Sequence, residues 1–172
     1  MTLKELYYSK GPGYYVTDKM THHRYIPTYS ELFAKWQHEP ISILEVGCYK
    51  NGSLKLWEEF FTQATIIGVD IQTYEGSVEL NRATVIIEDF YSSNRELPDF
   101  DLMIEDGPHD VNSQLAFVRK MYPKLKEGGL MIIEDVRPDY QPHFDTLGIP
   151  YTAIAFHPYT DENDDRILLF QK

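Results

Sequence analysis

Residues 41–71 read ISILEVGCYKNGSLKLWEEFFTQATIIGVDI, and this stretch decides the fold class. It holds two short apolar runs, 41–47 and 65–71, on either side of a segment, 53–61, whose apolar residues recur at helical spacing. Strands that are apolar throughout and separated by a helix are typical of a parallel sheet covered on both faces. The stretch therefore predicts a strand–helix–strand unit of an α/β sheet.

The same alternation continues to the C-terminus. We expect five further strands and two further helices, the strands at 83–89, 100–106, 130–135, 151–156 and 166–171 and the helices at 111–125 and 139–148. Only about a dozen residues separate the second strand from the third, so this crossover is expected to be short or loop-like. The acidic string TDENDD before the last strand suggests the turn of an antiparallel hairpin. The pattern predicts a doubly wound, Rossmann-like α/β fold over residues 40–172, a single domain with a mostly parallel sheet and an antiparallel C-terminal hairpin.

Residues 1–39 have a different character and are expected to form an N-terminal arm. Residues 1–29 are rich in Tyr, His and Lys and are interrupted by Gly and Pro, which indicates an extended segment with short helical turns and not a core element. Ser30 is expected to cap a short helix over 31–37, which Pro40 ends.

The composition argues against several classes of protein. Of the 172 residues, 27 are acidic and 16 are basic, so the net charge is -11. This balance argues against a protein that binds the nucleic-acid backbone. No apolar run approaches the length of a membrane span. The single cysteine, Cys48, cannot form an internal disulfide, so a cytoplasmic protein with no nucleic-acid or membrane partner is expected.

The turn after the first strand, from Gly47 to Gly52, fits neither of two common phosphate-binding loops. The dinucleotide fingerprint requires a glycine where Tyr49 stands, and the P-loop requires a lysine where Ser53 stands. Glycine does permit close backbone approach to a ligand, and Ser53 begins the next helix. The alternative interpretation is that both glycines merely form a tight turn.

Three strand ends carry acidic residues where an open α/β sheet binds its ligand. Glu45, at the first, repels phosphate and suits an ammonium group. Asp70, at the second, could accept two hydrogen bonds from a ribose diol, and Glu88-Asp89, at the third, could bind an adenine amino group. An adenosine that also carries an ammonium group satisfies all three, so these residues predict S-adenosylmethionine (SAM) as the cofactor.

The fourth and fifth strands end in two further acidic pairs, Glu105-Asp106 and Glu134-Asp135. Because these strands are neighbours in a doubly wound sheet, about 4.8 Å apart, their carboxylates crowd one volume. Like charges repel unless a cation gathers them or protons are taken up, and hard oxygen ligands favour Mg²⁺, Ca²⁺ or Mn²⁺. His109, three residues beyond Asp106, is a candidate general base. The alternatives are a helix-capping or exposed histidine and a solvated acidic turn.

Several strings of this sequence occur together in one known family. In the C-terminal half they are Ile104-Glu105-Asp106-Gly107-Pro108-His109, Tyr122-Pro123-Lys124-Leu125 and Gly128-Gly129-Leu130-Met131-Ile132-Ile133-Glu134-Asp135. In the arm and the first half they are Thr17-Asp18-Lys19, His23, Tyr25, Pro27, Tyr29, Glu45-Val46-Gly47, Gly52-Ser53-Leu54, Trp57 and Gly68-Val69-Asp70-Ile71. From about residue 14 to residue 140, the chain resembles the macrocin and mycinamicin sugar O-methyltransferases.

This resemblance implies a SAM-dependent O-methyltransferase with bound Mg²⁺ that acts on a hydroxyl of a sugar or glycosylated metabolite, so the partner would be a small-molecule or glycan acceptor. By position, Asp106, Glu134 and Asp135 would be the metal ligands and His109 the base. The cofactor-binding positions would be Lys19, His23, Tyr25, Glu45, Gly47, Gly52, Ser53, Asp70, Ile71, Glu88, Asp89 and Phe90.

The chain departs from the family pattern at two places. Pro108 replaces the family's serine in the turn that carries His109. After the third strand the family has a Gly-Asp-Gln segment, where this chain has Glu88-Asp89-Phe90-Tyr91.

The arm is expected to cover the cofactor site. Lys19, His23 and Tyr25 would fold over the cofactor and donate hydrogen bonds to its carboxylate, which Glu45 would otherwise repel. The alternative is an exposed tail whose tyrosines mediate self-association into a homo-oligomer.

Two other functions remain open at this stage. One is a metal-independent methyltransferase whose strand-end acids bind an amine substrate. The other is a catalytically silent SAM-binding module, against which Glu134-Asp135 and His109 argue, because a sensor needs neither a metal nor a base. The sequence does not indicate the acceptor, because specificity lies in loops without a shared pattern.

Overall fold

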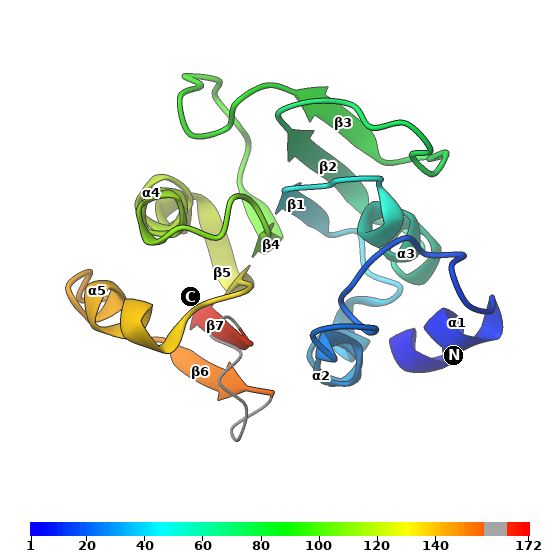
Figure 1. Cartoon of the computed structure of the whole chain (residues 1–172), viewed down its shortest axis with the longest axis horizontal. Helices are drawn as coiled ribbons and strands as arrows, with labels where there is room; N and C mark the ends of the chain where they lie inside the picture. The colour runs from blue at the N-terminus through cyan, green and yellow to red at the C-terminus, as the bar shows by residue number, and fades with distance from the viewer. Residues whose placement is uncertain (157–164) are drawn as a thin grey trace.

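The computed structural model describes residues 1–156 and 165–172 of the chain. The described strands form one seven-stranded sheet in the order β3-β2-β1-β4-β5-β7-β6 (Figure 1). Their bounds are β1 Ser42–Val46, β2 Thr65–Asp70, β3 Thr84–Ile87, β4 Phe100–Glu105, β5 Leu125–Ile133, β6 Thr152–Ala155 and β7 Arg166–Gln171. Neighbouring strands are parallel except at β7, which is antiparallel to β5 and to β6. The predicted sheet and its antiparallel C-terminal hairpin are confirmed.

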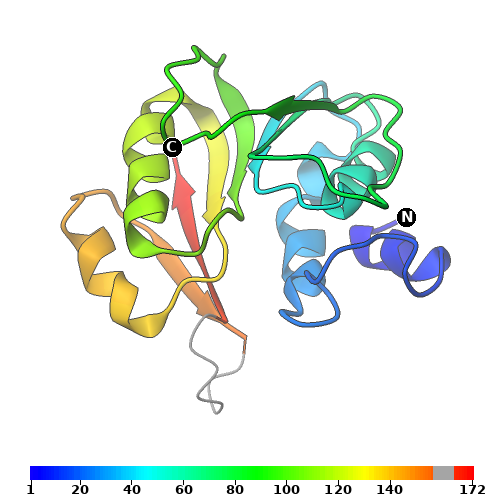
Figure 2. The same ribbon diagram turned by 45° about the horizontal axis from the view of Figure 1, so that its top comes forward.

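Helices cover both faces of this sheet, as Figures 1 and 2 show. One face carries α4 and α5, and the other carries α1, α2 and α3. Their bounds are α1 Leu3–Ser9, α2 Tyr25–Leu32, α3 Gly52–Phe60, α4 Val111–Met121 and α5 Gln141–Asp145, with short 3-10 helices η1 Ala34–Trp36, η2 Tyr122–Lys124 and η3 Pro138–Tyr140. The side chains of successive strand residues point to opposite faces of the sheet. Ile43, for example, packs into one apolar cluster and Leu44 into the other. This two-sided burial is the reason that the strands are apolar throughout.

The arm is part of the core, so the prediction that residues 1–29 contain no core element is wrong. Tyr25, Ile26 and Tyr29 in α2 have no exposed surface, and they belong to the apolar cluster on the α3 side of the sheet. The helix expected over 31–37 begins earlier, at Tyr25, and ends at Leu32. Pro27 does not break it, because a proline in the first helical turn removes an N–H that has no partner within the helix.

The connection between β2 and β3, residues 71–83, contains no helix, as the short spacing predicted. Glu58, near the end of α3, accepts hydrogen bonds at 2.9–3.3 Å from the backbone N–H groups of Asn81, Arg82 and Ala83. The Arg82 guanidinium in turn donates to carbonyl oxygens of Glu58, Phe61 and Ala64 at the end of α3. The Glu58 bonds satisfy backbone N–H groups of the connection that a crossover helix would satisfy internally, and the Arg82 bonds satisfy carbonyl groups at the end of α3 and just beyond it.

Two smaller expectations differ from the structure. The helix expected over 111–125 ends at Met121 and continues as η2, which contains Pro123. β5 starts earlier than expected, at Leu125. The expected acidic turn TDENDD lies outside the described residues except for Asp165. None of the helices in the described parts of the chain has the length and apolar character needed to cross a membrane.

Candidate functional site

A cavity of about 780 Å³ opens beside the carboxyl ends of β1, β2 and β4. Its walls come from the turn after β1, the segments after β2 and β3, the turn after β4, and arm residues between Gly13 and Thr21. Small-molecule sites in proteins span roughly 300–1,000 Å³, so the cavity can hold a ligand of nucleoside size. It lies where open α/β sheets bind ligands.

Close packing of chain segments explains the two glycines of the turn after β1. Gly47 has a φ of 89°, and a Cβ placed on it would lie 1.8 Å from the carbonyl oxygen of Asp106. A Cβ on Gly52 would lie 2.0 Å from the carbonyl oxygen of Val16 in the arm. Gly47 thus brings the turns after β1 and β4 together, and Gly52 lets the arm cross the start of α3. Gly47 lines the cavity.

Asp70 lies at the end of β2, where backbone hydrogen bonds fix one of its two carboxylate oxygens. Its Oδ2 accepts hydrogen bonds of 2.8 Å from the backbone N–H groups of Cys48 and Tyr49. Its Oδ1 has longer contacts, 3.4 Å to the N–H of Gln72 and 3.3 Å to the Tyr74 hydroxyl. Asp70 and the adjacent Ile71, which is exposed, both line the cavity. This carboxylate is therefore oriented by the backbone and can still accept hydrogen bonds from a bound hydroxyl.

The acidic residues after β3 line the cavity, but their carboxylates are engaged within their own loop. Glu88 pairs with Arg95 at 2.9 Å and accepts from Ser93 at 3.0 Å. Asp89 accepts from the backbone N–H of Tyr91 at 3.0 Å. Phe90, which follows Asp89, also lines the cavity and is buried.

Glu45 lies behind the cavity wall. It is fully buried and accepts hydrogen bonds from the Ser53 hydroxyl at 2.7 Å and from the Trp57 indole, so it joins β1 to α3. Its third contact is Lys19 Nζ at 3.5 Å. Ser53 lines the cavity, whereas Glu45 and Gly52 are not among the residues that form its wall.

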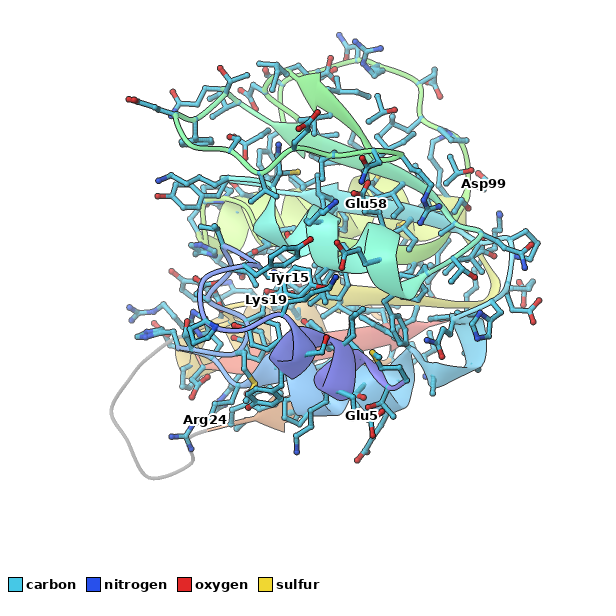
Figure 3. All side chains as sticks on the ribbon, turned by 90° about the vertical axis from the view of Figure 1, so that its right-hand side faces the viewer. Glu5, Tyr15, Lys19, Arg24, Glu58 and Asp99 are labelled. Carbon is cyan, nitrogen blue, oxygen red and sulfur yellow. The ribbon has the colours of Figure 1, made fainter. Side chains whose placement is uncertain are left out.

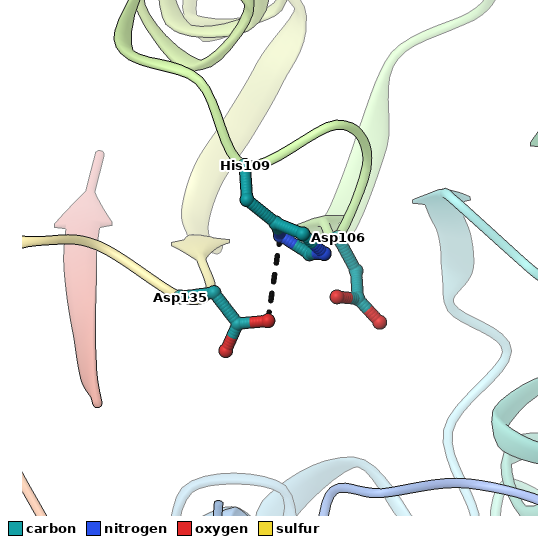
Figure 4. A group of neighbouring side chains, drawn as sticks. All are labelled: Asp106, His109 and Asp135. Atoms are coloured by element: carbon teal, nitrogen blue, oxygen red, sulfur yellow. Dashed lines mark ion pairs between the residues drawn. The ribbon is translucent and has the colours of Figure 1, made fainter. Parts of the chain in front are cut away.

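We use the name acidic centre for Asp106, Glu134 and Asp135, which the neighbouring strands β4 and β5 bring together. Asp106, His109 and Asp135 each offer a ligand atom within 4.8 Å of the others (Figure 4). His109 Nδ1 lies 3.3 Å from Asp135 Oδ2. His109 and Asp135 both have positive φ angles, 55° and 53°, a backbone conformation that is uncommon outside glycine and that often marks functional sites.

The arm provides the hydrogen-bond donors of the acidic centre. Lys19 Nζ lies 2.6 Å from Asp106 Oδ2 and 2.6 Å from Glu134 Oε2. The Tyr29 hydroxyl donates to Glu134 Oε1 at 2.7 Å, and the Tyr25 hydroxyl donates to Asp135 Oδ1 at 2.6 Å. Figure 3 shows Lys19 and Tyr15 toward the middle of the molecule, whereas Glu5, Arg24 and Asp99 lie at its rim.

Three arm residues, Lys19, His23 and Tyr25, were expected to bind the cofactor. All three instead contact carboxylates of the acidic centre. Lys19 and Tyr25 make the bonds just described, and His23 Nδ1 lies 3.4 Å from Asp135 Oδ1. None of the three is among the residues that line the cavity in the described part of the chain. The cavity is lined instead by neighbours of Lys19 in the arm, Val16, Thr17, Asp18 and Thr21.

Burial and charge set the protonation of this cluster. Burial alone would lower the pKa of Lys19, but the facing carboxylates of Asp106, Glu134 and Glu45 outweigh it and raise that pKa above its usual value. Burial raises the pKa of Glu134, with Lys19 opposing and Asp135 adding to the shift. Burial also raises the pKa of the Tyr29 phenol, so Lys19 stays charged and Tyr29 stays a donor at neutral pH.

Two tyrosines near the site were given no role from the sequence. Tyr29 lies inside the matched arm string, and its spacing of four residues from Tyr25 could have placed both on one helical face. Tyr91, which lines the cavity, donates to the buried Glu105. Burial raises the pKa of Glu105 to about 7. No local signal pairs Tyr91 with Glu105, because the contact joins the loop after β3 to the end of β4.

Similar proteins are sugar O-methyltransferases. The chain is 32% identical to 8-demethyl-8-(2-methoxy-alpha-L-rhamnosyl)-tetracenomycin-C 3'-O-methyltransferase of Streptomyces olivaceus, over 71% of this chain and 34% of the relative. It is 30% identical to demethylmacrocin O-methyltransferase of Streptomyces fradiae and to mycinamicin VI 2''-O-methyltransferase of Micromonospora griseorubida, in both cases over 71% of this chain and 34% of the relative. No protein-family model matches the chain.

Solved structures show the same fold. The methyltransferase MycE, in complex with Mg, SAH and mycinamycin VI, superposes with a TM-score of 0.76 at 23% identity, over 100% of this chain and 54% of that chain. An O-methyltransferase from Bacillus cereus in complex with SAH superposes with a TM-score of 0.64 at 13% identity, over 99% of this chain and 90% of that chain. The resemblance inferred from the sequence strings is confirmed. The chain, which spans about a third of the length of the curated relatives it matches, is a homologue of the macrocin- and mycinamicin-type sugar O-methyltransferases and has their Rossmann-like methyltransferase fold.

Proposed function

We propose that this chain transfers a methyl group from SAM to a hydroxyl of a sugar or glycosylated metabolite, with the help of Mg²⁺. The observation that carries the proposal is that one cavity joins Asp70, at the end of β2, to Asp106 and His109, after β4. The first is suited to the ribose of a nucleoside, and the other two are suited to activating a hydroxyl. The relatives that match the chain are named as sugar O-methyltransferases.

The cavity fits the cofactor at its β1–β3 end. Asp70 Oδ1 can accept hydrogen bonds from the ribose hydroxyls, and the apolar side chains of Ile71 and Phe90 offer surfaces for the adenine ring. The carboxylates of Glu88 and Asp89 are engaged in their own loop, so we expect them to shape that wall rather than to bind the adenine amino group. SAM, when bound, supplies the methyl group on its sulfonium sulfur.

The acidic centre fits a hard divalent cation. Lys19 contacts Oδ2 of Asp106, whereas Tyr25 and His109 contact Oδ1 and Oδ2 of Asp135. Both oxygens of Glu134 are engaged, one by Lys19 and one by Tyr29. We propose Asp106, Glu134 and Asp135 as the carboxylate ligands, because a carboxylate oxygen that accepts one hydrogen bond keeps a second lone pair for a cation. A bound Mg²⁺ would make a coordinated acceptor hydroxyl more acidic.

We propose His109 as the general base. Its Nδ1 faces Asp135 Oδ2, which orients the ring and leaves Nε2 to take the proton of an acceptor hydroxyl, as in other histidine–carboxylate pairs. The side chain is 43% exposed, so an acceptor can reach it. The same position also allows His109 to be a third metal ligand. The two roles differ in effect, because losing a base lowers kcat, whereas losing a ligand weakens Mg²⁺ binding.

A binding and turnover experiment tests the proposal. SAH binding is measured by calorimetry with and without Mg²⁺, and formation of SAH from SAM is then followed with rhamnosides and macrolide glycosides as acceptors. We expect SAH to bind and at least one glycoside to be methylated in an Mg²⁺-dependent reaction. Absence of SAM and SAH binding would refute the proposal, and SAM binding without any effect of Mg²⁺ would refute its metal-dependent part.

A further inference from the structure

Tyr91 joins two loops that line the cavity. Its hydroxyl donates to Glu105, a residue at the end of β4 that has no exposed surface. The oxygen that accepts this bond, Oε1 of Glu105, also accepts the backbone N–H of Gly107 at 3.2 Å. Tyr91 and Gly107 both line the cavity. One buried carboxylate oxygen thus connects the loop after β3 to the turn after β4.

The hydroxyl of Tyr91 lies directly against the backbone of that turn. A Cβ placed on Gly107 would lie 2.3 Å from the Tyr91 hydroxyl oxygen and 2.9 Å from Oε1 of Glu105. The other oxygen of Glu105, Oε2, is buried and has no hydrogen-bond partner among the residues that the structure describes. Because the Gly107 bond is internal to the turn, Glu105 depends on the Tyr91 hydroxyl for the orientation of its carboxylate.

The loop that carries Tyr91 is itself anchored to α4. Lys120 of this helix donates to the carbonyl oxygens of Phe90 and Ser93, in both cases at 2.8 Å. The Phe90 ring packs against the ring of Phe117, also in α4, with the centroids 5.4 Å apart. The backbone is thus tied down on both sides of Tyr91, so its hydroxyl reaches the turn after β4 from a fixed point.

The turn held in this way carries His109, the proposed base (Figure 4). His109 lies two residues beyond Gly107 and has a φ of 55°, a backbone conformation that is costly outside glycine and persists only where surrounding contacts impose it. The turn is fixed at one end by the N–H of Asp106, which donates to Val46 at 2.8 Å, and at the other by Asp110, which caps α4. Between these ends, the bond of the Gly107 N–H holds the strained backbone.

We propose that Tyr91 is a positioning residue for His109: by orienting Glu105, its hydroxyl holds Gly107 and thereby the strained turn that presents the imidazole to the acceptor. This inference rests on the proposed function, because it concerns the same general base. It assigns a task to a residue of the segment at which the chain departs from the family pattern, and that task is exerted through protein contacts and not on the cofactor.

The experiment compares the wild type with four variants of the full chain. Tyr91→Phe keeps the ring and removes the hydroxyl. His109→Ala removes the base, and the double variant Tyr91→Phe/His109→Ala combines the two changes. Tyr151→Phe is the matched control, because it removes a hydroxyl that donates to the Asp145 carboxylate at 2.6 Å, away from the cavity wall. For each protein, kcat is measured with a glycoside that the wild type methylates, SAH affinity by calorimetry, and amide hydrogen exchange by NMR.

If Tyr91 positions His109, Tyr91→Phe lowers kcat about 10- to 100-fold, because a misplaced catalytic group loses that much rate. SAH affinity is unchanged, since the hydroxyl is engaged by Glu105. In the His109→Ala background the same substitution changes kcat by less than about threefold, because the effects of residues that act as one unit are not additive. Tyr151→Phe leaves kcat unchanged. A general loss of structure would instead lower kcat and SAH affinity together.

Hydrogen exchange tests the link without an acceptor. The amide of Gly107 exchanges about 3- to 10-fold faster in Tyr91→Phe than in the wild type, because its acceptor is no longer fixed. The amides of Asn112 and Ser113, which donate to Asp110 at 3.0 and 3.1 Å, keep their rates. An unchanged exchange rate of Gly107 would overturn the inference. A wild type that methylates no glycoside would refute the proposed function, whereas the exchange rates decide the link from Tyr91 to the turn.

Three outcomes of the other measurements also overturn the inference. A lower SAH affinity with an unchanged kcat would mean that the Tyr91 hydroxyl acts on the cofactor. An equal loss of kcat in the presence and in the absence of His109 would mean that Tyr91 acts on a group other than the base. An unchanged kcat and SAH affinity would mean that the hydroxyl has no part in positioning.

Discussion

The two ends of the cavity are built in different ways. At the cofactor end, the carboxylates are held by segments nearby in sequence: Asp70 by backbone groups 21 and 22 residues away, and Glu88 by Arg95, seven residues away. At the acidic centre, Lys19 and Tyr29 reach across 87 to 115 residues to hold Asp106 and Glu134. The carboxylates of the cofactor end are thus held by groups outside the arm, whereas those of the acidic centre are held by the arm.

The largest expected effect is on kcat, and it distinguishes a role of His109 in the reaction from a role in cofactor binding. His109→Ala should lower kcat about 10²- to 10⁴-fold, because an acceptor hydroxyl loses its base. SAM affinity should stay nearly intact, and the residual rate should rise with pH as hydroxide takes over the proton. Initial rates across pH, together with SAH calorimetry, check this. Loss of SAH binding would show that His109 shapes the cofactor pocket, and full activity would show that it is not the base.

The next effect is confined to the cofactor end. Asp70→Ala should weaken SAM binding by about 1.5–3 kcal/mol, roughly ten- to a hundredfold, through loss of hydrogen bonds to the ribose. Mg²⁺ binding should not change, since Asp70 is not part of the acidic centre. Calorimetry with both ligands measures the two affinities separately. Unchanged SAH affinity in a folded variant would place the cofactor elsewhere.

A pH-dependent effect concerns the connection between β2 and β3. Burial alone would raise the pKa of Glu58, but hydrogen bonds from Lys55 and from the backbone at 81–83 outweigh it and lower the pKa to about 2, from the usual 4.5. A carboxylate whose pKa is lowered by folding stabilises the folded state above its unfolded pKa, and this contribution is lost as the pH falls toward the folded pKa. Glu58→Gln should therefore cost about 1.5–3 kcal/mol at pH 7.

Urea unfolding of both proteins at several pH values tests this. The difference in unfolding free energy between wild type and Glu58→Gln should shrink as the pH falls from about 4.5 toward 2. The neighbouring Glu59→Gln serves as a comparison on the same helix: Glu59 bonds Tyr14 and Tyr15 of the arm rather than the 81–83 segment, and hydrogen bonds from these tyrosines lower its pKa as well. A difference that is independent of pH would contradict the assigned role of Glu58.

The smallest expected effect tests the dependence of the acidic centre on the arm. Tyr29→Phe removes the hydroxyl that donates to Glu134 Oε1 and should lower stability by about 1–3 kcal/mol, because a buried acceptor is left unsatisfied. Tyr14→Phe, whose hydroxyl bonds Glu59 at an exposed site, should cost less than about 0.5 kcal/mol. Thermal and urea unfolding measure both. Equal losses of unfolding free energy in the two variants would mean that the buried Tyr29–Glu134 bond stabilises the protein no more than the exposed Tyr14–Glu59 bond does.

The strands were predictable because their signal is local. A strand buried on both faces must be apolar along its length, so the runs 41–47, 65–71 and 100–106 coincide with β1, β2 and β4 to within about a residue at each end. The position of the acidic residues followed from the same pattern, since parallel strands end at one edge of the sheet.

The roles of those acidic residues were not predictable in the same way. Glu45, Asp70 and Glu134 all follow or end an apolar run, and nothing local distinguishes them. The structure does: Glu45 bonds Trp57, Asp70 borders the cavity, and Glu134 bonds the arm. A carboxylate's function depends on whether its oxygens already have donors, and those donors can come from any part of the chain.

The arm is the clearest case in which local sequence pattern failed to predict structure, because tertiary packing determines its conformation. Its glycines, prolines and histidines predicted an extended segment because local propensity is all that such a pattern reports. Burial of Tyr25, Tyr29 and Lys19 depends on a surface that exists only once α3 and the sheet have formed. The strands, and the edge of the sheet that carries the site, thus follow from local apolar periodicity. The tertiary structure alone decides which carboxylates face the cavity, because long-range hydrogen bonds and charge pairing select among chemically equivalent groups.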